Sequence, residues 1–269
     1  MALTLNIDIK TDQGIRFLEF RELKKLGIPH LMTTKDYNTS LKRPGLPEAI
    51  EAQYRHILQL LNAPSDRFWL LEQVHSNQVV AVRSSLEAEV FPPGRMIRGV
   101  DGMVSNEPGI SMATTFADCV PLVLVDPVSG AVANIHSGWK GTLDQIGKTG
   151  LQKMIELYGT KTEDVKVFIG PHIQSKDFEV RQDLTEAFEN VFGRILPKVE
   201  AGNYIQFKDQ DHWTIDLSAV IESMFLELGI AAGNIYAARE STYEQSDLFH
   251  SWRRDGRAFG IMSLVTLIP

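Results

Sequence analysis

The sequence of 269 residues contains 43% hydrophobic and 23% charged residues, a balance that is typical of a globular protein. Its formal net charge is −7 at pH 7 and no run of lysine or arginine stands out, which argues against a protein that binds duplex nucleic acid. No stretch approaches the ~18 apolar residues of a membrane span, and residues 1–8 lack the basic and long apolar regions of a signal peptide.

Apolar runs with alternating or continuous character predict strands along the whole chain, and apolar residues at helical spacing predict helices between some of them. The expected strands are 3–9, 68–74, 78–82, 110–116, 122–125, 131–135, 165–169, 235–238 and 259–267. The expected helices are 47–61, 142–158, 182–192 and 216–228, the last with Asp216 as its N-cap.

These strands come both as hairpins and between helices. The mixture predicts an α+β fold with mixed, largely antiparallel sheets flanked by helices, rather than a doubly wound parallel sheet. The sequence contains no internal repeat, low-complexity tract or linker-like segment. We therefore expect one domain over residues 1–269.

Cys119 is the only cysteine, so the chain has no intrachain disulfide and a reducing, cytoplasmic compartment is the simple expectation. His136 follows 17 residues later, and residues 126–130 between them have the composition of a turn. A hairpin centred on residues 127–128 places Cys119 directly opposite His136, with Cβ atoms roughly 5 Å apart. Such a pair can share a metal ion or form a thiolate–imidazole pair.

Several short motifs are dense in polar and glycine residues next to predicted strands and helices. They are QVHS at 73–76, DGMV at 101–104, ADCVP at 117–121, HSGWKG at 136–141, IGP at 169–171 and SWRR at 251–254. Together they resemble the bacterial YlmD/YfiH-type proteins, once called laccase-domain or polyphenol oxidase proteins. These proteins are described as purine nucleoside phosphorylases with adenosine deaminase activity. The resemblance implies a YfiH-like α+β fold.

The resemblance also implies a zinc site formed by His75, Cys119 and His136 of this sequence. Two imidazoles and one thiolate are good zinc ligands, and three protein ligands leave a fourth position open, as in catalytic zinc sites. Copper is the less favoured metal. The same three residues, together with Asp118, are the expected catalytic group, in which Asp118 orients a ligating imidazole or handles a proton. The alternative for Asp118 is a turn or capping role.

Three residues are expected to bind substrate. Lys140 lies where a predicted strand gives way to a helix, so its charge and the helix N-terminus can hold an anion. Arg253 offers forked donors suited to phosphate, and Ser76 lies next to His75. If residues 253 and 254 are extended, their side chains point to opposite faces, and only one of them faces the site. A solvated lysine and a surface arginine paired with a carboxylate are the alternatives.

The resemblance implies zinc-dependent phosphorolysis of purine nucleosides, with adenosine, inosine and guanosine as substrates and methylthioadenosine as a further candidate. Adenosine deamination is the second implied activity. The expected partners are a purine nucleoside and phosphate, without nucleic acid or membrane, and the oligomeric state is left open.

Three alternatives remain open at this point. One is a Cys–His hydrolase or deamidase, with Cys119 as the nucleophile and His136 as its base. The second is copper-dependent phenol oxidation, since His₂Cys is also a blue-copper ligand set, although seven histidines are few for an additional trinuclear cluster. The third is a metal-binding partner protein without catalytic activity.

Overall fold

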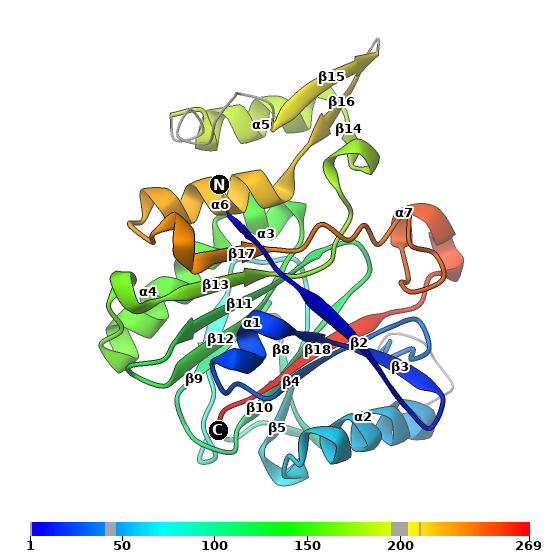
Figure 1. Ribbon diagram of the computed structural model, residues 1–269, viewed down its shortest axis with the longest axis vertical. Helices are drawn as coiled ribbons and strands as arrows, with labels where there is room; N and C mark the ends of the chain where they lie inside the picture. Colours follow the sequence, from blue (N-terminus) through cyan, green and yellow to red (C-terminus); the bar gives the residue numbers. More distant parts are fainter. Residues whose placement is uncertain (1, 41–46, 195–203, 210) are drawn as a thin grey trace.

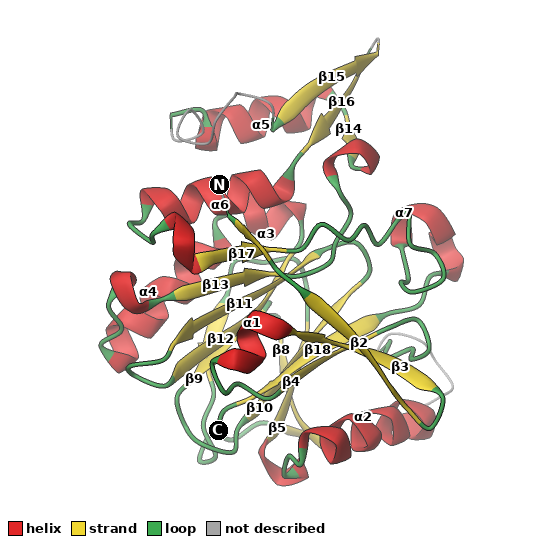
Figure 2. Ribbon diagram, in the orientation of Figure 1, coloured by secondary structure: helices red, strands yellow, loops and turns green. Residues whose placement is uncertain are grey.

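The computed structural model describes residues 2–40, 47–194, 204–209 and 211–269. Two large sheets pack face to face, and helices cover the outer side of each (Figures 1 and 2). A small third sheet lies with α5 at the top of the view in Figure 1, far from α2 at the bottom. The layers of the body of the protein are therefore helix, sheet, sheet and helix.

The seven-stranded sheet has the order β1 (Leu3–Thr4), β17 (Ile235–Ala237), β13 (Lys166–Ile169), β11 (Val120–Asp126), β12 (Ala131–Ser137), β9 (Gly102–Ser105) and β6 (Val79–Ala81). The eight-stranded sheet has the order β2 (Ile7–Asp12), β3 (Ile15–Phe20), β4 (His30–Thr33), β18 (Met262–Leu267), β10 (Ser111–Phe116), β5 (Phe68–Glu72), β8 (Gly94–Arg98) and β7 (Glu89–Phe91). The three-stranded sheet has the order β14 (Glu179–Val180), β16 (His212–Ile215) and β15 (Ile205–Asp209).

The helices are α1 (Arg21–Lys25), α2 (Pro47–Leu61), α3 (Trp139–Leu143), α4 (Ile146–Tyr158), α5 (Gln182–Phe192), α6 (Leu217–Glu227) and α7 (Trp252–Asp255). Both large sheets combine parallel with antiparallel pairs. Antiparallel pairs predominate in the eight-stranded sheet and make up half of the pairs in the seven-stranded sheet, so they are the majority in the two sheets taken together. The predicted α+β fold with mixed, largely antiparallel sheets is confirmed. None of the helices in the described ranges combines the length and the apolar character that crossing a bilayer requires.

Strand β11 is apolar on both faces because it lies inside two cores at once. Leu122 and Leu124 face the helices α4 and α6, whereas Val123 and Val125 face the eight-stranded sheet. All seven residues of the strand are buried. This explains why the sequence of β11 is a continuous apolar run rather than an alternating one.

The predicted helices 47–61 and 182–192 are confirmed at both ends, and Asp216 caps α6 by accepting a hydrogen bond from Ala219 N at 2.9 Å. The predicted helix 142–158 is wrong as a single element, because Gln145 adopts a left-handed φ of +58° between α3 and α4. Apolar spacing does not reveal this break, since both helices pack their apolar residues on the same core.

The predicted strand 3–9 is also wrong as one element. Its first part pairs with β17 in the seven-stranded sheet, and its second part pairs with β3 in the eight-stranded sheet. Between them, Leu5 N donates to Ala237 O and Asn6 O accepts from Arg21 N. The alternating pattern correctly predicts an extended chain. It does not show that the chain changes from one pairing strand to another within this segment.

The hairpin of β11 and β12 has a longer turn than predicted, so its register differs. The carboxylate of Asp126 accepts hydrogen bonds from the backbone of Val128 and Ser129, and Gly130 completes the loop at a φ of +71°. With this four-residue loop, Pro121 rather than Cys119 stands opposite His136. The predicted direct pairing of Cys119 with His136 is therefore wrong.

Asn134 links the two large sheets through their shared core. It is fully buried on β12, and its Nδ2 donates to Met112 O at 2.8 Å and to Leu264 O at 3.1 Å in the facing sheet. Its Oδ1 accepts from Thr114 Oγ1. These bonds fix the position of one sheet over the other at a point where apolar packing alone is not directional.

We expect Asn134→Leu to lower the free energy of unfolding by roughly 2–4 kcal/mol, because it leaves several buried polar groups without a partner. Urea denaturation measures this difference. The matched control is Asn106→Leu, at an exposed position, for which we expect a change below about 0.5 kcal/mol. Equal stabilities of the two variants would contradict the role of Asn134.

Candidate metal centre

Three segments that carry the chain from the eight-stranded to the seven-stranded sheet meet at one end of the two-sheet stack. They are 73–78 between β5 and β6, 99–101 between β8 and β9, and 117–119 between β10 and β11. The first contains His75 and the third contains Cys119. Two of the three metal-ligand candidates are therefore held by crossings between two rigid sheets rather than by a long loop.

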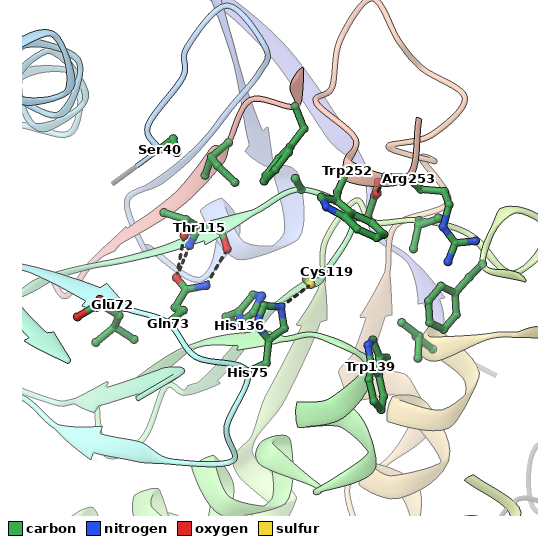
Figure 3. Close-up of a pocket in the computed structure, with 18 of the residues that line it drawn as sticks. Ser40, Glu72, Gln73, His75, Thr115, Cys119, His136, Trp139, Trp252 and Arg253 are labelled. Atoms are coloured by element: carbon green, nitrogen blue, oxygen red, sulfur yellow. Dashed lines mark hydrogen bonds between the residues drawn. The ribbon is translucent and has the colours of Figure 1, made fainter. Parts of the chain in front are cut away.

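The structure brings the three predicted ligands together, since His136 projects from β12 toward the two crossings (Figure 3). Their ligand atoms all lie within 4.8 Å of one another. Cys119 Sγ lies 3.7 Å from His75 Nε2, and the two imidazole rings meet edge to face with centroids 4.8 Å apart. A tetrahedral zinc ion with bonds of ~2.0–2.3 Å separates its ligand atoms by roughly 3.3–3.8 Å, so the cluster fits this ion with small side-chain adjustments.

Gly138 makes room for this cluster. Continuing the β11–β12 register by one residue places Gly138 opposite Cys119. A Cβ atom on Gly138 would lie 2.7 Å from His75 Cδ2 and 3.1 Å from Cys119 Sγ. The φ of Gly138 is −70°, so the position requires glycine for space rather than for backbone conformation.

Asp101 holds two of the three ligands in place, and sequence reasoning gave it no role. Its carboxylate is fully buried and accepts hydrogen bonds on both oxygens. Oδ2 accepts from Ser76 N at 2.6 Å, Ser76 Oγ at 2.7 Å and Val74 N at 3.2 Å. Oδ1 accepts from His75 N at 3.0 Å and bonds His136 Nδ1 at 2.9 Å. The signal in the sequence was the DGMV motif directly before a strand.

These bonds fix the tautomer of His136. Burial opposes the ionisation of Asp101, but the hydrogen bonds from His136 and Ser76 outweigh this effect and hold the pKa of Asp101 well below its usual range. An ionised carboxylate only accepts, so His136 Nδ1 donates to it. Its Nε2 is left to face Cys119 and His75, as in the carboxylate–histidine–zinc arrangement.

The charges of Cys119 and His136 support each other. Burial opposes ionisation of the Cys119 thiol, but the charge of His136 and hydrogen bonds from both imidazoles outweigh it and lower the pKa of Cys119 to about 6. Burial likewise opposes the charged form of His136, yet the Cys119 thiolate and Asp101 raise the pKa of His136 to about 9. Both shifts favour a thiolate–imidazolium pair in the metal-free protein.

Only some of the remaining predicted site residues line the pocket that opens beside the metal-ligand cluster. Asp118 and Arg253 line it, whereas Lys140 and Ser76 are not among the described residues that do. Lys140 is exposed on α3, and Ser76 is half-buried with its hydroxyl directed to Asp101. The imidazole-orienting role that we considered for Asp118 is filled by Asp101.

A pocket of about 810 Å³ opens beside the metal-ligand cluster. Its walls are mostly apolar, and two tryptophans, Trp139 and Trp252, line it with exposed fractions of 42% and 56% (Figure 3). Arg253 lies in the same wall, and its guanidinium carbon is 5.6 Å from the ring centroid of Phe178. The volume and lining are those of a small-molecule site.

Comparisons with known proteins agree on a family and a fold. The family model described as multi-copper polyphenol oxidoreductase laccase matches residues 27–268. A protein of Bacteroides thetaiotaomicron named purine nucleoside phosphorylase is 37% identical over 185 residues, which are 68% of this chain and 67% of that protein. A protein of Bacillus subtilis named purine nucleoside phosphorylase YlmD is 29% identical and covers 78% of this chain and 74% of its own length.

Two solved structures have the same fold as this chain. YlmD from Geobacillus stearothermophilus has a TM-score of 0.85 at 24% identity, covering 98% of this chain and 99% of that one. The hypothetical protein YfiH from Bacillus licheniformis has a TM-score of 0.85 at 23% identity, covering 97% and 99%. At these identities the likeness establishes the fold.

We expect Asp101→Asn to weaken zinc binding by about 10- to 100-fold, since an amide cannot accept all the bonds that hold residues 74–76 and His136. Competition titration with a chelator measures the affinity. The matched control is Asp216→Asn, because asparagine caps a helix as well as aspartate does. An unchanged zinc affinity in Asp101→Asn would show that the carboxylate does not position the ligands.

Metal affinity should rise with pH. Between about pH 6 and about pH 9 the metal-free pair binds one proton, on His136, and metal coordination releases it. The apparent affinity should therefore increase about tenfold per pH unit in this window, level off above it and fall more steeply below it. Calorimetry in buffers of different ionisation enthalpy counts the released proton. A pH-independent affinity would contradict the thiolate–imidazolium pair.

Proposed function

Because this chain belongs to the multi-copper polyphenol oxidoreductase laccase family, with relatives that are named purine nucleoside phosphorylases, we propose that it is a zinc-dependent purine nucleoside phosphorylase. Its substrates are inorganic phosphate and adenosine, inosine or guanosine, with methylthioadenosine as a further candidate. Adenosine deaminase is its second activity. We further propose that residues 1–269 act as one domain in the cytoplasm, where a reducing environment keeps the sole thiol available as a ligand.

The observation that carries this proposal is the position of the three ligands. His75, Cys119 and His136 line the same pocket as Arg253 and the two tryptophans. A structural metal site is closed by four protein ligands, whereas this cluster has three and faces a cavity large enough for a nucleoside. The arrangement supports binding of a metal ion that contacts a small-molecule substrate.

Arg253 is the proposed phosphate-binding residue. Its Nη1 donates to Asp177 O at 3.2 Å and to Glu179 O at 3.1 Å, which fixes one end of the guanidinium. Its other side-chain N–H groups have no hydrogen-bond partner within the described ranges, and they belong to a residue that lines the pocket. A planar, pre-oriented fork of this kind suits two oxygens of a phosphate.

Trp139 and Trp252 are the proposed base-binding residues. Both side chains line the same pocket and are 42% and 56% exposed, so together they offer the apolar surface on which a ligand binds. Stacking of an aromatic side chain on a base is worth about 1–3 kcal/mol and does not depend on which base it is. This contact supports a site that accepts several purines.

In the proposed reaction a phosphate oxygen forms a bond to C1′ of the ribose, while the bond from C1′ to N9 breaks and its electron pair leaves with the purine, which takes up the proton that hydrogen phosphate gives up. The products are ribose 1-phosphate and the free base. Bound zinc supplies a Lewis acid for this chemistry. Arg253 orients the nucleophile, the tryptophans hold the base, and Asp101 keeps His136 in its ligating tautomer. In the deaminase reaction the oxygen of water forms a bond to C6 of adenosine in the same pocket, the C6–N bond breaks, and ammonia leaves to give inosine.

A Cys–His hydrolase is the second candidate, because Cys119, His136 and Asp101 follow one another in the order of a thiolate, imidazole and carboxylate triad. This reading leaves His75 without a role.

The copper-oxidase reading has less support, since the described residues contain one cluster of metal-ligand type and a multicopper oxidase needs further copper sites.

We expect zinc-loaded wild-type protein to convert inosine and phosphate to hypoxanthine and ribose 1-phosphate, and Cys119→Ala to lose both bound metal and turnover while it stays folded. Elemental analysis, chromatography of the products and circular dichroism measure the three properties. His212→Ala, on the peripheral three-stranded sheet, is the control and should retain metal and activity.

Two results would contradict the proposal. One is the absence of phosphate-dependent base release by protein that carries one zinc ion per chain. The other is activity that rises when a chelator removes the metal, as expected of a hydrolase that uses Cys119 as its nucleophile.

A further inference from the structure

Asp118 connects the metal centre to the opposite wall of the pocket. It precedes the ligand Cys119, its side chain is 7% exposed, and its φ of +80° lies in the left-handed region that aspartate and asparagine tolerate better than most residues. Within the described residues, neither imidazole of the centre is among the hydrogen-bond partners of its carboxylate. The carboxylate is directed instead to segments more than a hundred positions later in the chain.

The hydrogen bonds of Asp118 converge on the start of α7. Oδ2 accepts from Arg253 N at 2.7 Å and from Ser251 Oγ at 3.0 Å. Ser251 caps the helix by accepting from Arg254 N at 3.1 Å. Oδ1 accepts from Thr242 Oγ1 at 2.7 Å, which ties in the preceding loop. One buried carboxylate therefore sets both the position and the capping of this four-residue helix.

The two neighbouring arginines of α7 point in different directions. The guanidinium of Arg254 donates to backbone carbonyls of Thr242, Tyr243 and Phe249, so it holds the loop together. Arg253 crosses to the carbonyls of residues 177 and 179 and lines the pocket. Asp118 thus fixes the backbone end of Arg253, while these carbonyls fix part of its guanidinium.

We propose that Asp118 is a positioning residue that acts through Arg253: its carboxylate fixes the backbone of α7 and thereby the place at which Arg253 meets the phosphate co-substrate. The inference rests on the proposed function for the identity of that anion. Displacing a binding group by about 1 Å can cost on the order of 100-fold in kcat/KM. The two oxygens of Asp118 accept three hydrogen bonds, and all three donors lie in the segment 242–253.

A double-mutant cycle tests this mechanism. Asp118→Gly removes the carboxylate without straining the positive φ, and we expect it to raise the KM for phosphate about tenfold while the nucleoside KM, kcat and zinc content change little. Arg253→Ala should raise the phosphate KM at least as much. The double variant should equal Arg253→Ala, since removing the positioning residue has no further effect once its target is gone.

Two further variants complete the design. Asp118→Asn keeps an acceptor for Arg253 N and tolerates the same backbone, so it should restore most of the phosphate affinity. Asp126→Asn is the matched control, because Asp126 is a buried carboxylate that accepts hydrogen bonds at the far end of β11 and should leave every kinetic constant unchanged. If Asp118→Gly does not fold, Ser251→Ala removes a bond to the same oxygen and takes its place in the cycle.

The inference is overturned if the effects of Asp118→Gly and Arg253→Ala multiply in the double variant, or if Asp118→Gly lowers kcat and leaves the phosphate KM unchanged. Crystal structures of wild type and Asp118→Gly test it independently of any reaction. They should show a displaced Arg253 guanidinium in the variant. An Arg253 that stays in place overturns the inference even if phosphorolysis is found, and a displaced one supports it even if phosphorolysis is absent.

Discussion

A buried carboxylate, that of Asp101, accepts hydrogen bonds from the backbone of residues 74–76 and from Nδ1 of His136. An ionised group without solvent is stable only when its oxygens are fully bonded, so the surrounding donors are held in one arrangement. The left-handed conformation of His75, with a φ of +60°, belongs to that arrangement. Two of the three candidate ligands, His75 and His136, are thus positioned by one carboxylate. The third, Cys119, is positioned by the register of the hairpin of β11 and β12.

The position of the site follows from how the chain crosses between its two large sheets. Segments 73–78, 99–101 and 117–119 all leave the eight-stranded sheet and enter the seven-stranded one at the same end. Each crossing is short, and the strands on both sides are packed in cores that share Asn134 as a polar link. The rigid part of the fold therefore reaches within three residues of each candidate ligand, and the pocket walls are added from α3, α5 and α7.

Local pattern predicted much of the fold, and the resemblance on short motifs predicted the ligand set that the structure gathers. The hairpin pattern correctly predicts that Cys119 and His136 lie close together but gives the wrong register, because the composition of residues 126–130 does not fix the length of the loop. Asp101 was missed, since its partners are distant in sequence and a carboxylate before a strand has many other uses. An extended chain at residues 253 and 254 would direct only one arginine to the site, and the resemblance favoured Arg253; the two side chains diverge instead because they lie on a short helix.

Zinc K-edge X-ray absorption on purified wild-type protein tests the central claim most directly, because it reports the atoms around the metal without assuming a reaction. The account predicts one sulfur at ~2.3 Å and two imidazole nitrogens at ~2.0–2.1 Å, with one further light atom at the open position. A first shell of nitrogen and oxygen without sulfur would contradict it, because Cys119 is the only thiol that the chain offers.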